Sequence, residues 1–381
     1  MDKIVMPMPE FNSQLSELVF ELEHERNRNI RGSTPPWLFF DLKEIMHRLE
    51  SLTSARIEGN RTTLLTVVER VIEDAKSTDD EGLQELANIE KALDFVEDNV
   101  PGRPIDNGFI CELHKMTTEG LSREGSKTPG QYRTANVTIL NSRHTPPDYT
   151  QVQPLMQELI EFVSQELPAQ KHLLHVAIAH HRMAAIHPFD NGNGRTVRLL
   201  TYAMLVKYGF IDTKGFRLLN PSAIFCMDRE RYYNMLELAD TGVEKNLLEW
   251  CSFVLAGIAS EVSKVNKLLD RKFAEQNIIH PSIDLALSKK QISEQEYAVM
   301  RIGMQKNIFA AKDVKHLFPK GPSQAVRTSQ LLAKMRKQRL IMVHPDHKTK
   351  YVIRFSNNYL LRGVIQQMAE HELLPLAIDE P

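Results

Sequence analysis

The chain has 381 residues, of which 42% are hydrophobic and 25% charged, as is ordinary for a folded globular protein. Its formal net charge of −2 excludes a uniformly basic chain, and no apolar run is long enough to cross a bilayer, so no membrane partner is expected. Three scattered cysteines without metal-ligand spacing, and an N-terminus without an apolar signal core, predict a cytoplasmic protein.

Apolar periodicity predicts helices through the first hundred residues, at about 15–22, 37–52, 62–75 and 88–96. Within this region Gly59 and Asn60 form a helix-ending signal. Glu58 therefore lies at the negative end of a helix dipole, where a carboxylate needs a compensating cation. Arg198 is the obvious partner if the two segments meet.

The next stretch contains a predicted helix at 108–120 and the best strand candidate of the central region. Residues 129–139 end in the alternating, β-branched segment Val137, Thr138 and Ile139, which predicts a strand; an irregular loop is the alternative. Helices are predicted again at 152–167 and 172–186.

The most informative stretch is residues 187–198, with sequence HPFDNGNGRTVR, which separates two predicted helices. Gly192 and Gly194 allow close backbone approach in a turn that feeds a helix N-terminus, which is a favourable site for an anion. Arg195 and Arg198 lie three residues apart and share a helix face suited to a polyphosphate. His187 lies at the start of the turn and is a candidate base. The alternative, a plain Asn-Gly turn, leaves the arginine pair unexplained.

After this motif, helices are predicted at 195–208, 228–239 and 246–265, followed by a helical connector at 266–281. Three short helices at 294–304, 311–318 and 323–338, and a hairpin formed by 340–343 and 351–353, predict a winged-helix domain. Basic residues lie on its third helix and hairpin tip, where such domains contact DNA; a protein-interaction surface is the alternative. These residues are Arg327, Lys334, Arg336, Lys337, Arg339, Lys348 and Lys350.

Two of these segments resemble signatures of the Fic family. Residues 187–198 match H-x-F-x-(D/E)-G-N-G-R-x-x-R at every defining position except one, where the chain has Asn191; its Asp190 comes one place too early. Residues 54–59 match the family's inhibitory pattern (S/T)-x-x-x-E-(G/N). The resemblance implies a helical fold and transfer of AMP from ATP, with Mg²⁺ or Mn²⁺, to a Ser, Thr or Tyr hydroxyl of a target protein.

The resemblance also implies a role for each candidate residue. His187 is the base, the backbone of Gly192 and Gly194 holds phosphate oxygens, and Asn193 contacts the α-phosphate. Arg195 and Arg198 neutralise the β- and γ-phosphates, and Glu58 blocks the γ-phosphate position by pairing with Arg198. The resemblance places Tyr232 and Tyr233 in the adenine pocket, although core packing is equally compatible with them. It places Val137, Thr138 and Ile139 in a target-binding β-hairpin flap, and it assigns Asn191 or Asp190 to the metal.

The sequence therefore predicts a mainly α protein with three parts: an N-terminal helical region carrying the inhibitory helix (1–100), a Fic catalytic core with a small β-hairpin flap (101–268), and a C-terminal winged-helix domain (269–381). The predicted function is autoinhibited protein adenylylation, or, within the same class, removal of AMP. The alternative is a nucleotide-sensing DNA-binding regulator with a weakened Fic module. The expected partners are ATP, a target protein and, through the winged helix, DNA or another protein; a homodimer is also compatible with the sequence.

Overall fold

The computed structural model describes residues 3–27, 35–73, 80–139, 142–212 and 218–375. The fold is mainly helical, as predicted, and the described residues form one small antiparallel sheet with strand order β1-β3-β2. Within the described part of the chain, no helix combines the length and apolarity needed to cross a membrane.

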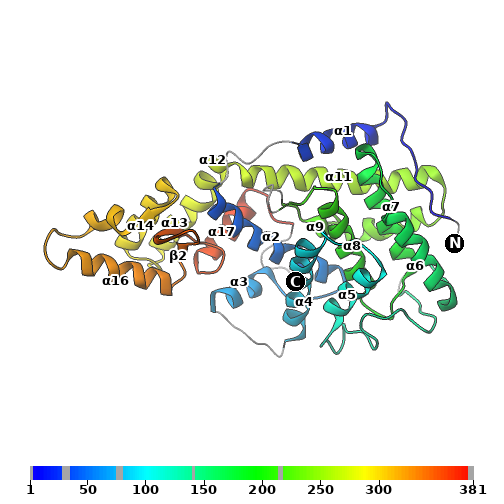
Figure 1. Cartoon of the computed structure of the whole chain (residues 1–381), viewed down its shortest axis with the longest axis horizontal. Coiled ribbons are helices and arrows are strands. Elements are labelled where there is room, and N and C mark those ends of the chain that lie inside the picture. The colour runs from blue at the N-terminus through cyan, green and yellow to red at the C-terminus, as the bar shows by residue number, and fades with distance from the viewer. Residues whose placement is uncertain (1–2, 28–34, 74–79, 140–141, 213–217, 376–381) are drawn as a thin grey trace.

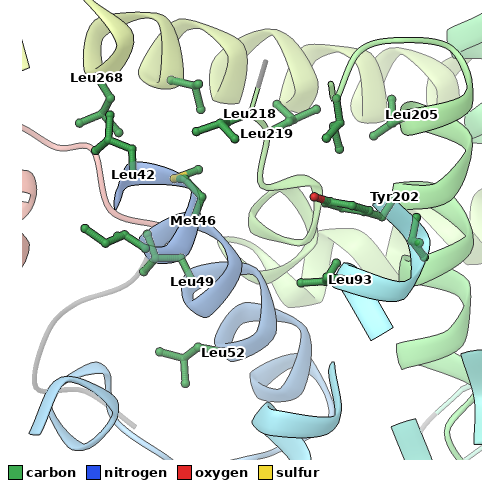
Figure 2. Close-up of a cluster of buried hydrophobic side chains, with 14 of the residues drawn as sticks. Leu42, Met46, Leu49, Leu52, Leu93, Tyr202, Leu205, Leu218, Leu219 and Leu268 are labelled. Atoms are coloured by element: carbon green, nitrogen blue, oxygen red, sulfur yellow. The ribbon is translucent and has the colours of Figure 1, made fainter. Parts of the chain in front are cut away.

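Four helices make up the N-terminal region: α1 (Gln14–Asn27), α2 (Pro36–Ile57), α3 (Leu64–Glu73) and α4 (Glu81–Asn99). Helix α2 begins with a proline at its first position, where the missing N–H costs nothing, and it continues beyond the predicted end at residue 52. Figure 2 shows Leu42, Met46, Leu49 and Leu52 spaced along α2, and all four are buried. This spacing gives α2 a continuous apolar stripe against the core. The predicted break at residues 77–80 falls mostly outside the described residues.

The central region contains the helices that surround the motif. They are α5 (Asn107–Thr118), α6 (Tyr149–Val163), α7 (His172–Ile186), α8 (Asn193–Lys207), α9 (Pro221–Cys226), α10 (Arg229–Ala239) and α11 (Glu244–Leu269), with a 3₁₀ turn at Ala169–Lys171. Helices α7 and α8 pack together, and α11 runs along the molecule in contact with α7 (Figure 1). The indole N–H of the fully buried Trp250 on α11 donates to the carbonyl of Ala177 on α7, at 2.8 Å. These contacts fix the two helices on either side of the motif.

The predicted strand at Val137–Ile139 is not formed among the described residues of this segment, whose backbone is irregular from 130 to 139 and from 142 to 148. A β-branched sequence forms a strand only when a neighbouring strand supplies hydrogen bonds, and none lies beside it in the described structure. Residues 140 and 141, where a hairpin would turn, lie outside the described residues.

The C-terminal part begins with a connector made of α12 (Arg271–Phe273), a π-helical segment (Ala274–Ile279) and α13 (His280–Ser288). The elements that follow are α14 (Glu294–Lys306), β1 (Phe309–Ala310), α15 (Ala311–Val314), a 3₁₀ turn (Lys315–Leu317), α16 (Gln324–Lys337), β2 (Ile341–His344), β3 (His347–Ile353) and α17 (Leu360–Glu370). Their order agrees with the three helices and hairpin predicted between 294 and 353. The description of this part as a winged-helix domain stays a prediction, as do the three domain boundaries.

The C-terminal part is joined to α2 by a buried carboxylate. Asp41 accepts a hydrogen bond from the backbone N–H of Phe355 at 2.6 Å and forms an ion pair with Arg354. Phe355 also packs edge-on against Trp37, with ring centroids 6.3 Å apart. The helix that leads to Glu58 is therefore held at its other end by the segment that follows β3.

Candidate functional site

The motif forms a sharp turn between α7 and α8. His187 caps α7 in the left-handed region, at φ 51°, and Gly192 precedes α8 with φ 73°. A Cβ at Gly192 would overlap the methyl group of Thr118, so both conformation and space require glycine here. Helix α8 begins at Asn193, and the unpaired N–H groups of its first turn face the loop, as an anion site requires.

The side chain of Asn193 closes the turn. Its carbonyl oxygen accepts from the N–H of Phe189 and its amide donates to the carbonyl of Phe189, both at 2.9 Å. Asn193 is 5% exposed, so the amide is committed to the loop backbone. The geometry thus favours a loop-shaping role over the predicted contact of this side chain with the α-phosphate, which stays untested.

His187 is a neutral base in this environment. Burial lowers the pKa of His187 to about 4, although a hydrogen bond with the backbone of Ala184 and the nearby charge of Glu58 both act to raise it. His187 as a whole residue is half-buried. At neutral pH the imidazole therefore has a free lone pair with which to accept a proton.

Arg198 and Glu58 meet, as the sequence predicts. A guanidinium nitrogen of Arg198 lies 2.8 Å from Oε1 of Glu58, and the same guanidinium donates to the hydroxyl and the carbonyl of Ser54 at 2.9 and 2.8 Å. Burial alone would raise the pKa of Glu58, but Arg198, and then Arg195, hold it below its ordinary value. Glu58 is therefore ionised beside the first turn of α8.

The carboxylate of Glu58 also rests against Gly194. A Cβ at Gly194 would overlap Oε1 of Glu58, so the carboxylate lies directly on the second residue of α8. This is the position that an anion bound to the N-terminus of α8 would take. A phosphate group at that place would overlap the Glu58 carboxylate.

Arg195 does not share the open face with Arg198. Its side chain is 1% exposed and lies 2.9 Å from Oε1 of the buried Glu85 on α4. It also donates to the carbonyl of Glu124 at 2.6 Å. Its predicted contact with phosphate stays untested, and its surroundings favour a structural charge pair.

Asp190 and Asn191 differ in what they leave available to a cation. The carboxylate of Asp190 accepts from the hydroxyl of Ser126 at 2.5 Å and from the N–H of Lys127 at 2.9 Å. Burial acts to raise the pKa of Asp190, but these hydrogen bonds outweigh it and hold the pKa below its ordinary value. The amide of Asn191 donates to Gly125 while its oxygen accepts from Gly192 N–H, at 3.1 and 2.7 Å.

These contacts make a poor donor set for Mg²⁺ or Mn²⁺. Both ions prefer carboxylate and phosphate oxygens, and the one carboxylate here already holds the neighbouring loop. The described residues contain no group of three or more His, Cys, Asp or Glu side chains arranged for a metal. A divalent ion would have to take most of its ligands from nucleotide phosphates and water, with at most a neutral oxygen from Asn191.

Tyr232 and Tyr233 differ in exposure, although their ring centroids lie 5.2 Å apart. Tyr232 is 2% exposed, and its hydroxyl is 2.9 Å from Nε2 of His180. Tyr233 is 39% exposed, and the guanidinium of Arg229 lies 5.6 Å from its ring centroid. Tyr232 is therefore a core residue, as one of the two interpretations predicts. Tyr233 is the tyrosine whose exposed ring could stack on the adenine of a nucleotide.

Two residues that the sequence analysis missed hold the loop in place. His114 is fully buried, stacks on Phe189 with centroids 3.7 Å apart, accepts from Gly130 N–H at 2.9 Å and lies 3.0 Å from the carbonyl of Asn191. Since Nδ1 accepts, Nε2 carries the proton and donates to Asn191, and burial lowers the pKa of His114 to about 4. Its ring thus joins the loop at Gly130 to the motif.

The other missed residue is Arg133, whose side chain is 4% exposed. Its guanidinium donates to the carbonyls of His187, Ala135 and Pro147 at 2.9, 3.1 and 2.6 Å. Arg133 therefore joins Ala135 and Pro147, which lie on either side of Val137–Ile139 in the chain, to the backbone of His187. No motif spacing marks His114 or Arg133, because each acts on partners distant in the sequence.

The fold and the site define a mainly helical protein in which one loop joins α7 to α8. His187 lies at the start of this loop, and a candidate anion site lies at its end. Residues 104–205 match the Fic/DOC family, so the resemblance predicted from the motif is confirmed over this part of the chain. Among curated proteins it is similar to "Protein adenylyltransferase Fic" of Drosophila willistoni, at 29% identity over 225 residues, and of Drosophila melanogaster, at 30% over 225 residues. Each match covers 58% of this chain but only 40% and 41% of the relatives' own lengths.

Solved structures show the same fold. A Fic family protein from Desulfovibrio desulfuricans G20 superposes with a TM-score of 0.56 and 19% identity, over 93% of this chain and 98% of that one. A Fic domain containing signaling protein from Bacteroides thetaiotaomicron gives a TM-score of 0.52 and 18% identity, over 66% of this chain and 97% of the other. At these identities the likeness concerns the fold alone.

Proposed function

We propose that the protein is an adenylyltransferase that transfers AMP from ATP to a hydroxyl side chain of a target protein. Support comes from the curated relatives, which are named protein adenylyltransferase, and from the site itself. The observation that carries the proposal is the position of His187. This neutral imidazole lies at the start of a loop that ends at the N-terminus of α8.

In the proposed reaction, His187 takes the proton of the target hydroxyl as its oxygen attacks the α-phosphorus of ATP. A new P–O bond to the target forms, the bond between the α-phosphorus and the bridging oxygen breaks, and pyrophosphate leaves. The N–H groups at the start of α8 stabilise phosphate oxygens, and Arg198 neutralises charge on the leaving group. Tyr233 offers its exposed ring to the adenine.

A divalent ion enters this proposal as a companion of ATP. Mg²⁺ or Mn²⁺ would neutralise phosphate charge, with Asn191 as the nearest uncharged oxygen donor. No step above depends on a metal bound by the protein itself. A cytoplasmic location and a homodimer stay predictions from the sequence.

We further propose that the wild-type enzyme is autoinhibited. Glu58 lies against Gly194 and pairs with Arg198, so it takes both the space and the counter-ion that a terminal phosphate needs. ATP bound in a productive pose must displace it. Loss of the Glu58 carboxylate should therefore release the activity.

Label transfer tests the reaction. Glu58→Gly protein is incubated with Mg²⁺ and ATP labelled at the α- or the γ-phosphate, with and without His187→Ala. The proposal expects protein-bound label from α-labelled ATP only, and none when His187 is replaced. Label from γ-labelled ATP would indicate a kinase, and no label from either would remove the adenylyltransferase proposal.

A second candidate function, DNA binding, is favoured by one observation. Residues 309–350 contain ten Lys and Arg residues against two Asp, a net charge of +8 in a chain whose total is −2. Arg327, Arg336 and Lys337 are exposed on α16, and Lys348 and Lys350 on β3, at the end of the molecule distant from α6 (Figure 1). A basic face of this kind suits a DNA backbone.

Anisotropy of a fluorescent 20-base-pair duplex measures that binding. The second candidate expects an affinity that falls steeply with salt and is lost in Arg327→Ala, Arg336→Ala, Lys337→Ala protein. A matched control replaces Lys3, Arg103 and Arg123, which lie outside the basic face. No binding at low salt would leave the adenylyltransferase proposal standing alone.

A further inference from the structure

The inhibitory turn is fastened to α4 two residues after Glu58. The side-chain amide of Asn60 donates to Oε2 of Glu85 at 2.8 Å and to the carbonyl of Gly82 at 3.0 Å, and its oxygen accepts from the N–H of Thr62 at 2.8 Å. One side chain thus fixes residues 60–62 and ties them to the first turns of α4.

Glu85 contacts the motif with its other oxygen. Oε1 lies 2.9 Å from Arg195, and the Glu85 side chain is buried. One carboxylate therefore holds the inhibitory turn on one side and the first arginine of the catalytic loop on the other. Close packing supports the contact, since a Cβ at Gly82 would come within 2.9 Å of the Thr62 hydroxyl.

We infer that Asn60 and Glu85 are positioning residues for inhibition. The hydrogen bond between them fixes the position of the turn after α2, so that Glu58 reaches Arg198. The inference rests on the proposed function, because it assigns a role in holding Glu58 over the nucleotide site. Helix α2 ends at Ile57, so the residues immediately after Glu58 decide where the turn goes. Without the tether, the turn keeps its covalent link to α2 but loses the hydrogen bonds from Asn60 to Gly82 and Glu85 on α4.

The same contact links inhibition to Arg195. A buried carboxylate beside a paired guanidinium is a strong hydrogen-bond acceptor. Any change that draws Arg195 away from Glu85 therefore alters the acceptor that holds Asn60. The position of the inhibitory turn and the charge pair of Arg195 with Glu85 are in this way linked through one side chain.

Asn60→Asp is the sharpest variant, because it keeps the size and the acceptor for Thr62 but removes both donors and sets a charge beside Glu85. The matched control is Asn99→Ala, since Asn99 donates only within its own helix, to Phe95, at the far end of α4. Loss of a hydrogen bond to a charged group weakens the hold on Glu58, so label transfer should rise roughly tenfold, which corresponds to about 1.4 kcal/mol. Asn60→Ala should act in the same direction.

The decisive comparison uses the Glu58→Gly background. If Asn60 acts through Glu58, Asn60→Asp accelerates transfer in the wild type and changes neither kcat nor KM when Glu58 is absent. A purely structural role would lower activity equally in both backgrounds, and that result, like an unchanged wild-type rate, would overturn the inference.

Hydrogen exchange separates this inference from the proposed function. In Asn60→Asp, and not in Asn99→Ala, amide exchange should accelerate in peptides spanning residues 55–63 while α2 remains protected. Acceleration with no label transfer even in Glu58→Gly protein would support the tether and count against the enzyme. Unchanged exchange at 55–63 would reject the tether whatever the activity.

Discussion

The carboxylate of Glu58 lies against Gly194 and within 2.8 Å of Arg198, so the end of α2 covers the start of α8. An acidic group at the C-terminal end of one helix meets the N-terminal end of another. The dipole of α2 disfavours the carboxylate there, whereas the dipole of α8 and the charge of Arg198 stabilise it. The arrangement occupies the place where a phosphate would bind.

Gly194→Ala tests this contact through stability. The new methyl group would push Glu58 from Arg198, so we expect a loss of about 1–2 kcal/mol in the free energy of unfolding of the wild type. In Glu58→Gly protein the same change should be neutral or slightly stabilising, since Ala favours a helix. Urea unfolding of the four proteins completes the double-mutant cycle. Additive effects would show that the two residues do not touch.

The charge pair of Arg195 and Glu85 makes a contrasting prediction. Arg195→Met leaves a buried carboxylate without its cation and should cost about 3–5 kcal/mol in the free energy of unfolding. Adding Glu85→Leu should recover much of that loss, because an apolar pair replaces the charges. If Arg195→Met leaves the urea midpoint unchanged, the arginine is available for phosphate and our structural assignment is wrong.

The pH dependence of transfer should reflect the low pKa of His187. The base must be neutral, and burial lowers its pKa to about 4, so activity should be constant from pH 8 to about 5.5 and fall only as the pH approaches 4. The Glu58 charge raises this pKa, so its removal in Glu58→Gly protein moves the acid limb lower still. Single-turnover rates between about pH 3.5 and 8 measure the upper part of this limb; a midpoint near 6.5 would mean that the ring is solvated.

Asn191→Asp would supply the missing carboxylate of the motif. In the Glu58→Gly background we expect the Mg²⁺ concentration for half-maximal transfer to fall on the order of tenfold, because ligand charge sets affinity for hard cations. Titration with Mg²⁺ and Mn²⁺ at fixed ATP measures the change. Asp190→Asn is the control, since that carboxylate holds Ser126 and Lys127. A metal requirement that changes only in the control would place the ion at Asp190.

Local signals explain what the sequence predicted well. The helix stop at Gly59 and the motif at 187–198 are short segments whose residues act within one turn, and their spacing carries the chemistry. The meeting of Glu58 with Arg198 followed from charge, because a carboxylate at a helix C-terminus needs a cation. The order of helices and strands from 294 to 353 likewise follows from periodicity and turn residues.

Long-range partners explain what the sequence could not predict. His114, Arg133, Glu85 and Asn60 each bond to residues at least sixteen positions away, and no spacing reveals them. The contact of Asn193 with the α-phosphate, which the family resemblance implies, stays a prediction, and both ends of this side chain bond within its own turn. The strand expected at Val137–Ile139 shows that β-branched composition does not create a strand without a partner.

The most direct test of the account compares the initial rate of AMP transfer by the wild type, Glu58→Gly and Glu119→Gly. Glu119 is the matched control: it too ends a helix and precedes a glycine with positive φ, at 76° beside 100° for Gly59, but it is exposed. The account predicts a rise of at least tenfold in Glu58→Gly alone. Equal rates in all three proteins, with ATP bound, would contradict it.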